Sequence, residues 1–210
     1  MPSRKANAAA EAAAPALSSH DRILQAAKQL FASRGYENTS TVNIARQAGT
    51  SESQLMKHFG SKEGLLEAIF EQGWEQMAYQ SRSVEEPASP KEKLRALLDL
   101  MVNTLQRDPE LKQLFLLEGR RVRKEGRMVL MTEGYLRFVK VLDGILGQMK
   151  QAGSLREDLD AQALRSGLTG MFEGMLRDQL LAERMGYPAT YGIKELRAVF
   201  NCMIEAVAKR

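Results

Sequence analysis

Cysteine and histidine are scarce in this 210-residue chain, and their scarcity excludes several kinds of site. The single cysteine, Cys202, rules out an intrachain disulfide, and without a cysteine cluster no structural zinc site is proposed. The two histidines, His20 and His58, lie far apart in the sequence and suggest no metal site. We therefore expect neither a metal nor a cofactor. Cys202 could be a redox sensor or simply a small hydrophobic residue of the last helix.

Long apolar runs and clusters of catalytic residues are also missing. No run approaches the length of a membrane-spanning helix, and the N-terminus has no signal-peptide hydrophobic core, so a cytoplasmic protein is predicted. No group of titratable residues has a catalytic spacing, so no enzymatic activity is expected. The net charge is only +4, which is too small to indicate a nucleic-acid partner by itself.

Strand-like alternation is absent too, and helical spacing takes its place. Apolar residues recur at intervals of three and four along most of the chain, which is typical of amphipathic helices. The sequence therefore predicts an all-α protein with no strand. A break is expected over residues 81–90, where Pro87 and Pro90 cannot sit inside a helix, and Ser89 with Glu92 forms a capping box that restarts one.

Residues 39–62 have the pattern of a helix-turn-helix. Ser40 can cap a first short helix, and Gly49 can take the left-handed conformation that ends it. Ser51 and Gln54 resemble a capping box, so a second helix should begin at once. Leu55 then points into the core, which leaves the polar face of this second helix exposed.

The surrounding residues extend this motif to a known family. Residues 23–66 closely resemble the N-terminal DNA-binding domain of the TetR family of bacterial transcriptional regulators. The resemblance is carried by ILQAAKQLFASRGYENTS at residues 23–40, NIARQAG at residues 43–49 and LMKHFGSKEGLL at residues 55–66. Two residues depart from the family pattern. Met56 replaces a tyrosine that usually bonds a phosphate, and Thr50 replaces a common valine in the turn.

A DNA site follows from the motif and the resemblance. Ser53, Gln54 and Lys57 point away from the core and are predicted to read base edges or adjacent phosphates in the major groove. Glu52 and Met56 flank them and are also predicted to bind DNA. Contacts that fix the register through the DNA backbone are predicted for Ser40, Thr41, His58 and Lys62. The partner is therefore predicted to be double-stranded DNA.

The resemblance also implies what the rest of the chain does. It implies a homodimer in which the last two helices of each subunit form a four-helix bundle, and a cavity for a small-molecule effector in the C-terminal domain. Gly167, Gly170 and Gly174 would permit close helix approach in that bundle, or would merely loosen their helix. The basic run at residues 119–127 could bind an acidic partner or ligand, or could be a solvated loop.

Nine residues are candidates for the lining of that cavity. The candidates are Met101, Leu105, Phe115, Glu118, Tyr135, Phe138, Met171, Phe172 and Met175. Most are aromatic or flexible apolar side chains, which suit a ligand pocket but equally suit a plain core. Glu118 could orient a cationic or hydroxylated ligand, or could form a surface salt bridge.

Three parts are therefore predicted: a disordered tail at residues 1–17, a helix-turn-helix DNA-binding domain at residues 18–62, and a helical ligand-binding and dimerisation domain at residues 63–210. The alanine-rich tail could instead be a basic arm that enters a minor groove. The function predicted is a ligand-responsive homodimeric repressor of a palindromic operator. The alternatives are an activator or effector-independent DNA-binding protein and, with less support, a helical small-molecule carrier or enzyme.

Overall fold

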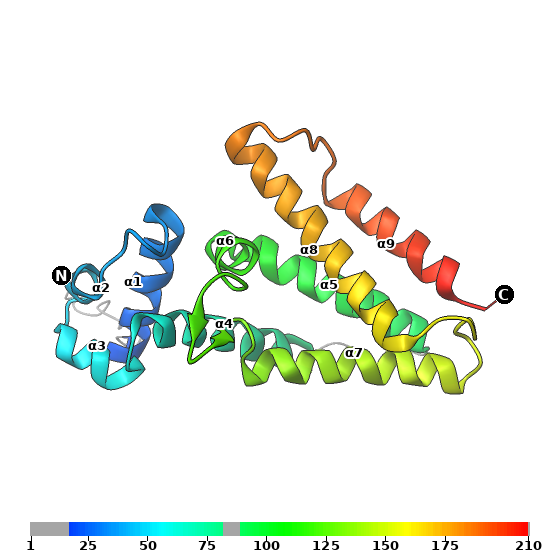
Figure 1. Ribbon diagram of the computed structural model, residues 1–210, viewed down its shortest axis with the longest axis horizontal. Coiled ribbons are helices and arrows are strands. Elements are labelled where there is room, and N and C mark those ends of the chain that lie inside the picture. The colour runs from blue at the N-terminus through cyan, green and yellow to red at the C-terminus, as the bar shows by residue number, and fades with distance from the viewer. Residues whose placement is uncertain (1–16, 82–88, 210) are drawn as a thin grey trace, which may run out of the picture.

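The computed structural model describes residues 17–81 and 89–209, and almost all of its regular structure is helical (Figure 1). The helices are α1 (Ser19–Arg34), α2 (Thr41–Gln47), α3 (Glu52–Phe59), α4 (Lys62–Ser81), α5 (Pro90–Arg107), α6 (Pro109–Leu117), α7 (Glu133–Gln151), α8 (Ala161–Met185) and α9 (Ile193–Val207). The predicted tail, apart from Leu17, and most of the predicted break lie outside the described residues. The all-α fold class is confirmed.

Side-chain caps set the helix starts where the sequence predicted them. The hydroxyl of Ser40 accepts from the N–H of Asn43 at 3.2 Å, and that of Ser51 accepts from the N–H of Gln54 at 3.2 Å. Ser89 and Glu92 complete the predicted capping box at the start of α5. Each cap pairs a backbone N–H that has no partner inside its helix. These bonds are local, which is why the sequence predicts them well.

The molecule has two parts joined by α4. Helices α1, α2 and α3 gather at one end, and α4 runs from them into the larger part formed by α5 to α9 (Figure 1). One continuous hydrophobic core passes through both parts along α4, from Leu65 and Phe70 to Trp74 and Met77. Because the same apolar stripe serves both parts, a shift of α4 changes packing in each of them.

Two glycines let neighbouring helices approach α4 closely. A Cβ atom added at Gly73 would lie 2.8 Å from a Leu111 methyl on α6, and one at Gly134 would lie 2.5 Å from the Trp74 Cβ. Both distances are too short for a side chain. These positions therefore bring α6 and α7 against α4.

The expectation that the chain holds no strand is wrong. Strands β1 (Arg123–Lys124) and β2 (Arg127–Met128) pair antiparallel, joined by Glu125 and Gly126 with φ of 50° and 79°. Two positive φ values in succession suit a tight hairpin turn. Strands of two residues are too short to show alternation, so this sequence pattern could not reveal them.

The hairpin and the turn before it are held by ion pairs. Lys124 lies 2.6 Å from Glu67 of α4. Arg121 lies 2.6 Å from Glu118 and 3.1 Å from Glu37. Glu118 thus forms the salt bridge that was one of its two predicted roles.

Within the described ranges no helix is both long and apolar enough to cross a membrane, and no group of acidic, His or Cys side chains could hold a metal ion.

Candidate DNA interface and ligand cavity

The turn between α2 and α3 is fixed by backbone bonds and by a brace from α1. Gly49 has φ of 63°, and the N–H of Thr50 donates to the carbonyl of Ala45 at 3.0 Å. The Arg22 guanidinium of α1 donates to the carbonyl of Ala48 at 3.1 Å. A left-handed glycine and an anchored carbonyl leave little freedom in the turn. The angle between α2 and α3 is therefore set by the fold.

Helix α3 presents a polar, open face. Leu55 is fully buried, whereas Ser53, Lys57 and His58 are exposed and Met56 is 41% exposed. Lys57 forms no ion pair with any side chain that the structure describes. An exposed, unpaired lysine next to hydroxyl and amide groups is suited to phosphates and base edges.

A histidine ties this helix to the start of α1. His58 Nε2 lies 3.2 Å from the Ser19 hydroxyl and 3.2 Å from the Gln54 side-chain nitrogen. The His58 ring also meets the edge of the His20 ring, with centroids 5.6 Å apart, and His20 packs on Phe59 at 4.9 Å. His58 and Gln54 thus hold each other in place. Sequence reasoning missed this cluster because residues 19 and 20 come from a different helix.

Other predicted DNA-binding residues also have partners inside the protein. The Thr41 hydroxyl donates to the Glu52 carboxylate. The Lys62 ammonium donates to the carbonyls of Tyr36 at 3.0 Å and Thr39 at 3.2 Å, and lies 4.2 Å from the centre of the Tyr36 ring. A phosphate at Lys62 would have to compete with these bonds. Its role at DNA stays a prediction, and its role in closing the α1–α2 loop onto α4 is new.

Tyr36 is the buried residue through which the loop between α1 and α2 contacts α4. Its hydroxyl donates to the Glu63 carboxylate at 2.9 Å. Burial, followed by this hydrogen bond, raises the pKa of the Tyr36 hydroxyl. The proton therefore stays on the tyrosine at neutral pH, where the hydroxyl donates to the Glu63 carboxylate.

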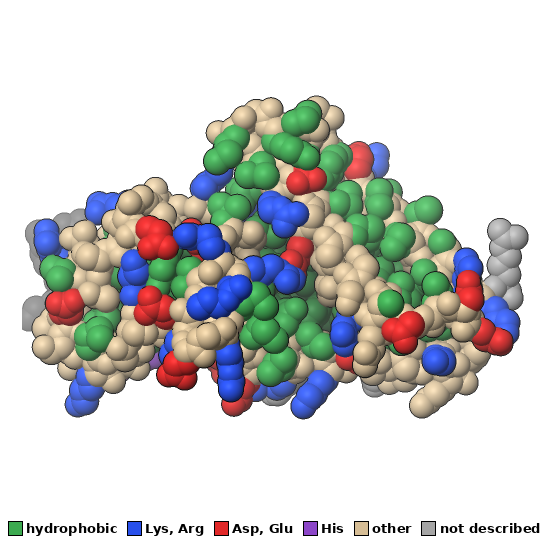
Figure 2. Space-filling view, viewed as in Figure 1, with side chains coloured by type: hydrophobic (Ala, Val, Ile, Leu, Met, Phe, Trp, Pro, Cys, Tyr) green, Lys and Arg blue, Asp and Glu red, His purple; other side chains and the backbone are tan. Residues whose placement is uncertain are grey.

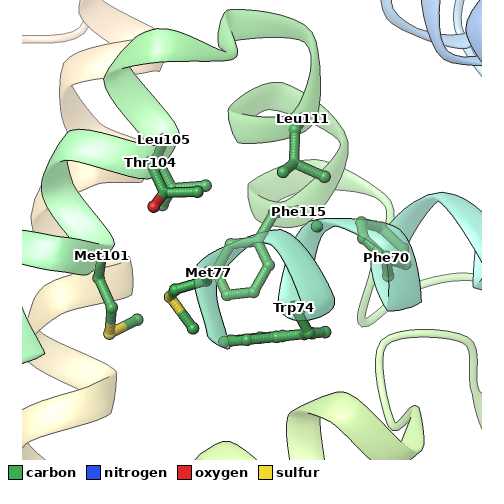
Figure 3. Close-up of a pocket in the computed structure, with 9 residues that line it drawn as sticks. Phe70, Trp74, Met77, Met101, Thr104, Leu105, Leu111 and Phe115 are labelled. Atoms are coloured by element: carbon green, nitrogen blue, oxygen red, sulfur yellow. The ribbon is translucent and has the colours of Figure 1, made fainter. Parts of the chain in front are cut away.

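An apolar cavity lies between α4, α5 and α6 (Figure 3). Its free volume for water-sized groups is about 30 Å³. It is lined by Phe70, Gly73, Trp74, Met77, Met101, Thr104, Leu105, Leu111 and Phe115. The predicted candidates Met101, Leu105 and Phe115 are among these residues. Sequence reasoning missed the side chains from α4, because their spacing marks a buried face but does not say what that face surrounds.

A second cavity lies beside the first, between α5, α7, α8 and α9. Its free volume is about 20 Å³, and its walls include Met101, Phe138 and Phe172, all predicted candidates. The remaining candidates line neither cavity. Tyr135 packs on Trp74 with ring centroids 5.5 Å apart, Glu118 pairs with Arg121, and Met171 and Met175 are partly buried against the core.

Comparison with known proteins agrees with this arrangement. Residues 23–69 match the model of bacterial regulatory proteins of the tetR family, and residues 70–196 match the model of the YsiA-like protein C-terminal region. The chain belongs to the TetR family. It is a TetR-family transcriptional regulator, with its DNA-binding domain at the N-terminus.

Two curated relatives and one solved structure add detail to the TetR assignment. The chain is 30% identical over 155 residues to a fatty acid metabolism regulator protein of Bacillus subtilis, covering 72% of this chain and 78% of the relative. It is also 30% identical over 166 residues to the nucleoid occlusion factor SlmA of Vibrio atlanticus, covering 74% and 81%. The structure of the transcriptional regulator FadR from Bacillus subtilis in complex with stearoyl-CoA superposes with a TM-score of 0.75 and 26% identity, covering 90% of this chain and 98% of that one.

Proposed function

We propose that this TetR-family regulator is a homodimeric repressor that binds a palindromic operator and releases it when a small molecule occupies the C-terminal part. The position of the first cavity carries the proposal. Helices α4 and α6 form its walls, and the same two helices pack against the DNA-binding part. A ligand that spreads these walls must therefore move the parts that hold the recognition helix α3.

Two polar contacts join α6 to α1. Lys28 of α1 lies 2.6 Å from the carboxylate of Asp108, the residue that caps α6. The side-chain amide of Gln113 on α6 donates to the carbonyl of Ala32 at 2.6 Å. Together they couple a displacement of α6 to the angle of α1. Repression is lost only if the ligand binds the displaced conformation more tightly than the DNA-bound one.

The chemistry of the cavity walls supports an apolar effector. Apart from the Thr104 hydroxyl, which donates to the Gln80 side chain at 3.3 Å, the side chains lining the first cavity are apolar. A relative of known structure, FadR from Bacillus subtilis, was crystallised with stearoyl-CoA. We infer that the effector carries a linear acyl chain and that this chain enters the cavities.

The surface of α9 supports the dimer. One face of α9 is buried in the chain's own core through Leu196, Phe200 and Ile204. A second face forms ion pairs with α5, including Arg197 with Asp99 at 2.7 Å. The third face is apolar and open. Its residues are Val199, Cys202 and Ala206.

Helix α8 presents a matching open face. A Cβ atom added at Gly167 or Gly170 would meet no other atom within 4 Å, and one at Gly174 would meet only the Arg177 side chain at 3.9 Å. These glycines therefore do not serve close packing inside the chain. Figure 2 shows hydrophobic side chains gathered over the part of the surface that α8 and α9 form. To read a palindromic operator, a second copy packed on this face would have to bring the two α3 helices into successive major grooves, roughly 34–36 Å apart.

A mobility-shift titration against the DNA upstream of the chain's own gene tests the DNA step. Wild type should bind one palindromic segment far more tightly than random DNA at physiological salt. Lys57→Ala should weaken binding to all sequences and lower the salt slope by about one, whereas Gln54→Ala should mainly relax discrimination at one base pair. Equal binding to random DNA would overturn the proposal. In vitro transcription from that promoter separates repression from activation.

Sedimentation of two matched variants tests the dimer. Val199 on α9 is 43% exposed and Val141 on α7 is 52% exposed. Val199→Asp places a charge in the proposed interface and should produce monomers, while Val141→Asp should leave the dimer intact. Dimers of equal stability for both variants would place the interface elsewhere.

The effector-independent alternative rests on the small size of the cavities, about 30 Å³ and about 20 Å³. Neither admits an acyl chain unless side chains move. Addition of palmitoyl-CoA and of palmitate to the DNA complex decides between the two. Release of operator supports an effector, and unchanged affinity with both compounds supports constitutive binding.

A further inference from the structure

The two cavities are neighbours that share one side chain. Met101 of α5 lines both, and the remaining wall between them includes the stacked rings of Trp74 and Phe138, with centroids 5.1 Å apart. Trp74 belongs to the first cavity and Phe138 to the second. The two spaces are therefore compartments on either side of one partition.

Helix α5 runs along both compartments. Leu94, Leu97 and Leu98 line the second, and Thr104 and Leu105 line the first, with Met101 between them. At ~1.5 Å of rise per residue, the face from Leu94 to Leu105 spans roughly 16 Å. A zigzag carbon chain advances about 1.3 Å per carbon with bonds of ~1.5 Å, so this face matches about a dozen carbons.

The three side chains of the partition, Trp74, Phe138 and Met101, differ in how freely they can change conformation. Trp74 is held on several sides, by Phe138, by Tyr135 at 5.5 Å and by Phe115 at 6.0 Å between ring centroids. Met101 is only partly buried and packs at the edge of the core. An unbranched thioether turns among several rotamers and takes the shape of what lies beside it. Of the three side chains, Met101 is the one that can move without dismantling the aromatic cluster.

We propose that Met101 is a gate that sets the preferred length of the effector's acyl chain. A short chain widens one compartment while Met101 stays in place. A long chain displaces the Met101 side chain, joins the compartments and presses on α4 and α6 together with α7 and α8. The inference rests on the proposed function, because it concerns the same effector, and it adds which residue distinguishes long chains from short ones.

The test uses the protein's single tryptophan, which lines the first compartment. Wild type, Met101→Phe and Met101→Ala are titrated with octanoyl-, dodecanoyl- and hexadecanoyl-CoA and with the free acids of the same lengths. Tryptophan fluorescence reports binding, and operator release is measured in parallel. If only the thioesters bind and release operator, the effector is an acyl-CoA. If only the free acids do so, the effector is a fatty acid.

Wild type should bind the sixteen-carbon chain at least about tenfold more tightly than the eight-carbon chain, because more methylenes are buried. In Met101→Phe the rigid ring should close the partition and reduce this preference to about twofold. In Met101→Ala the preference should be as large as in wild type or larger. Met171→Phe is the matched control, since Met171 lines neither cavity.

The possible failures are distinguishable. If no acyl compound changes the fluorescence or releases operator from wild type, the proposed effector class is wrong. If long chains bind and release operator but Met101→Phe keeps the wild-type preference for length, the effector class stands and the gate is wrong. Thermal melting of each variant without ligand shows whether a loss of binding is caused by misfolding. If Met101→Phe is misfolded, Met101→Leu, whose side chain branches near the backbone, replaces it.

Discussion

Lys28 and Asp108 join the two parts of the molecule through a contact that also begins a helix. The Lys28 ammonium lies 2.6 Å from one carboxylate oxygen of Asp108, and the other oxygen accepts from the N–H of Leu111 at 2.9 Å. Both side chains are about three-quarters buried, with 25% and 24% exposed. The cap holds α6 in its direction, and the ion pair ties that direction to α1.

Removing the charge of Lys28 should weaken communication between effector and operator. Lys28→Met keeps the aliphatic stem and Asp108→Asn keeps the cap, so each should cost only about 1 kcal/mol of stability. We expect both variants to bind operator as wild type does, but palmitoyl-CoA should weaken that binding several-fold less. The measurement is the ratio of operator Kd with and without the acyl compound.

Lys91→Met provides the control, because Lys91 pairs with Glu205 of α9 and lies at the opposite end of α5 from Asp108. If the three variants respond to palmitoyl-CoA as wild type does, the route through α6 and α1 is wrong. The coupling would then pass through α4 alone.

Gly134 should not tolerate a side chain, and Gly144 in the same helix should. A Cβ atom at Gly134 would lie 2.5 Å from the Trp74 Cβ, while one at Gly144 would meet nothing within 4 Å. Gly134→Ala should therefore lower the free energy of unfolding by about 1–3 kcal/mol through overpacking. Gly144→Ala should raise it by about 0.5–1 kcal/mol, because alanine favours helix. Urea unfolding at one fixed protein concentration measures both, and a loss of equal size at Gly144 would contradict this explanation.

Acid should weaken the contact between α4 and α7 through Glu71. Its carboxylate accepts from the N–H of Gly134 at 2.8 Å and from Arg137 at 2.6 Å. Burial would raise the Glu71 pKa, but hydrogen bonds from Thr132, from the Gly134 backbone and from Arg137 outweigh it and lower the pKa below its ordinary value of 4.5. The carboxylate therefore stabilises the fold above that pH, and its contribution is lost as the pH falls through the lowered pKa.

Glu71→Gln isolates this contribution. At pH 7 the variant should be less stable than wild type by about 1 kcal/mol, the value of charged hydrogen bonds discounted for partial exposure. The difference should shrink as the pH is lowered below the ordinary carboxyl value of 4.5. Urea unfolding at a series of pH values measures it, and a difference that does not change with pH would show that the charge is not what stabilises the contact.

The sequence predicted the features that depend on neighbours along the chain. The capping hydroxyls of Ser40, Ser51 and Ser89 lie three residues before the N–H groups from which they accept. Both partners of each bond are therefore found in one short segment of the sequence. The buried face of each helix repeats every three or four residues for the same reason. The fold class and the helix-turn-helix were therefore accessible without a structure.

The contacts that sequence reasoning missed join distant segments. His58 meets Ser19 across the DNA-binding part, and Lys62 donates to carbonyls in the loop before α2. The spacing of apolar residues on α4 predicts that Trp74 is buried, but a buried residue beside a cavity and one in a solid core have the same pattern. Whether this cavity exists depends on how three helices pack, and no local pattern contains that information.

Met56 is the predicted DNA contact that most directly distinguishes this regulator from its family. It is 41% exposed on α3, at the position where the family usually has a tyrosine that bonds a phosphate. Met56→Tyr should restore that bond and tighten binding to every DNA sequence by about 1 kcal/mol, or roughly fivefold, because a phosphate contact carries no sequence information.

The affinities for operator and for random DNA should therefore both rise, and the ratio of the two affinities should stay constant. If methionine instead contacts a thymine methyl, Met56→Tyr should lower the affinity for the operator alone, and the ratio should fall. Met56→Ala distinguishes the two cases further, since an apolar base contact would be lost at the operator and nothing would be lost at random DNA. Titrations of all three proteins against both DNAs at the same salt concentration measure the ratio, and an unchanged operator affinity for both variants would remove Met56 from the DNA interface.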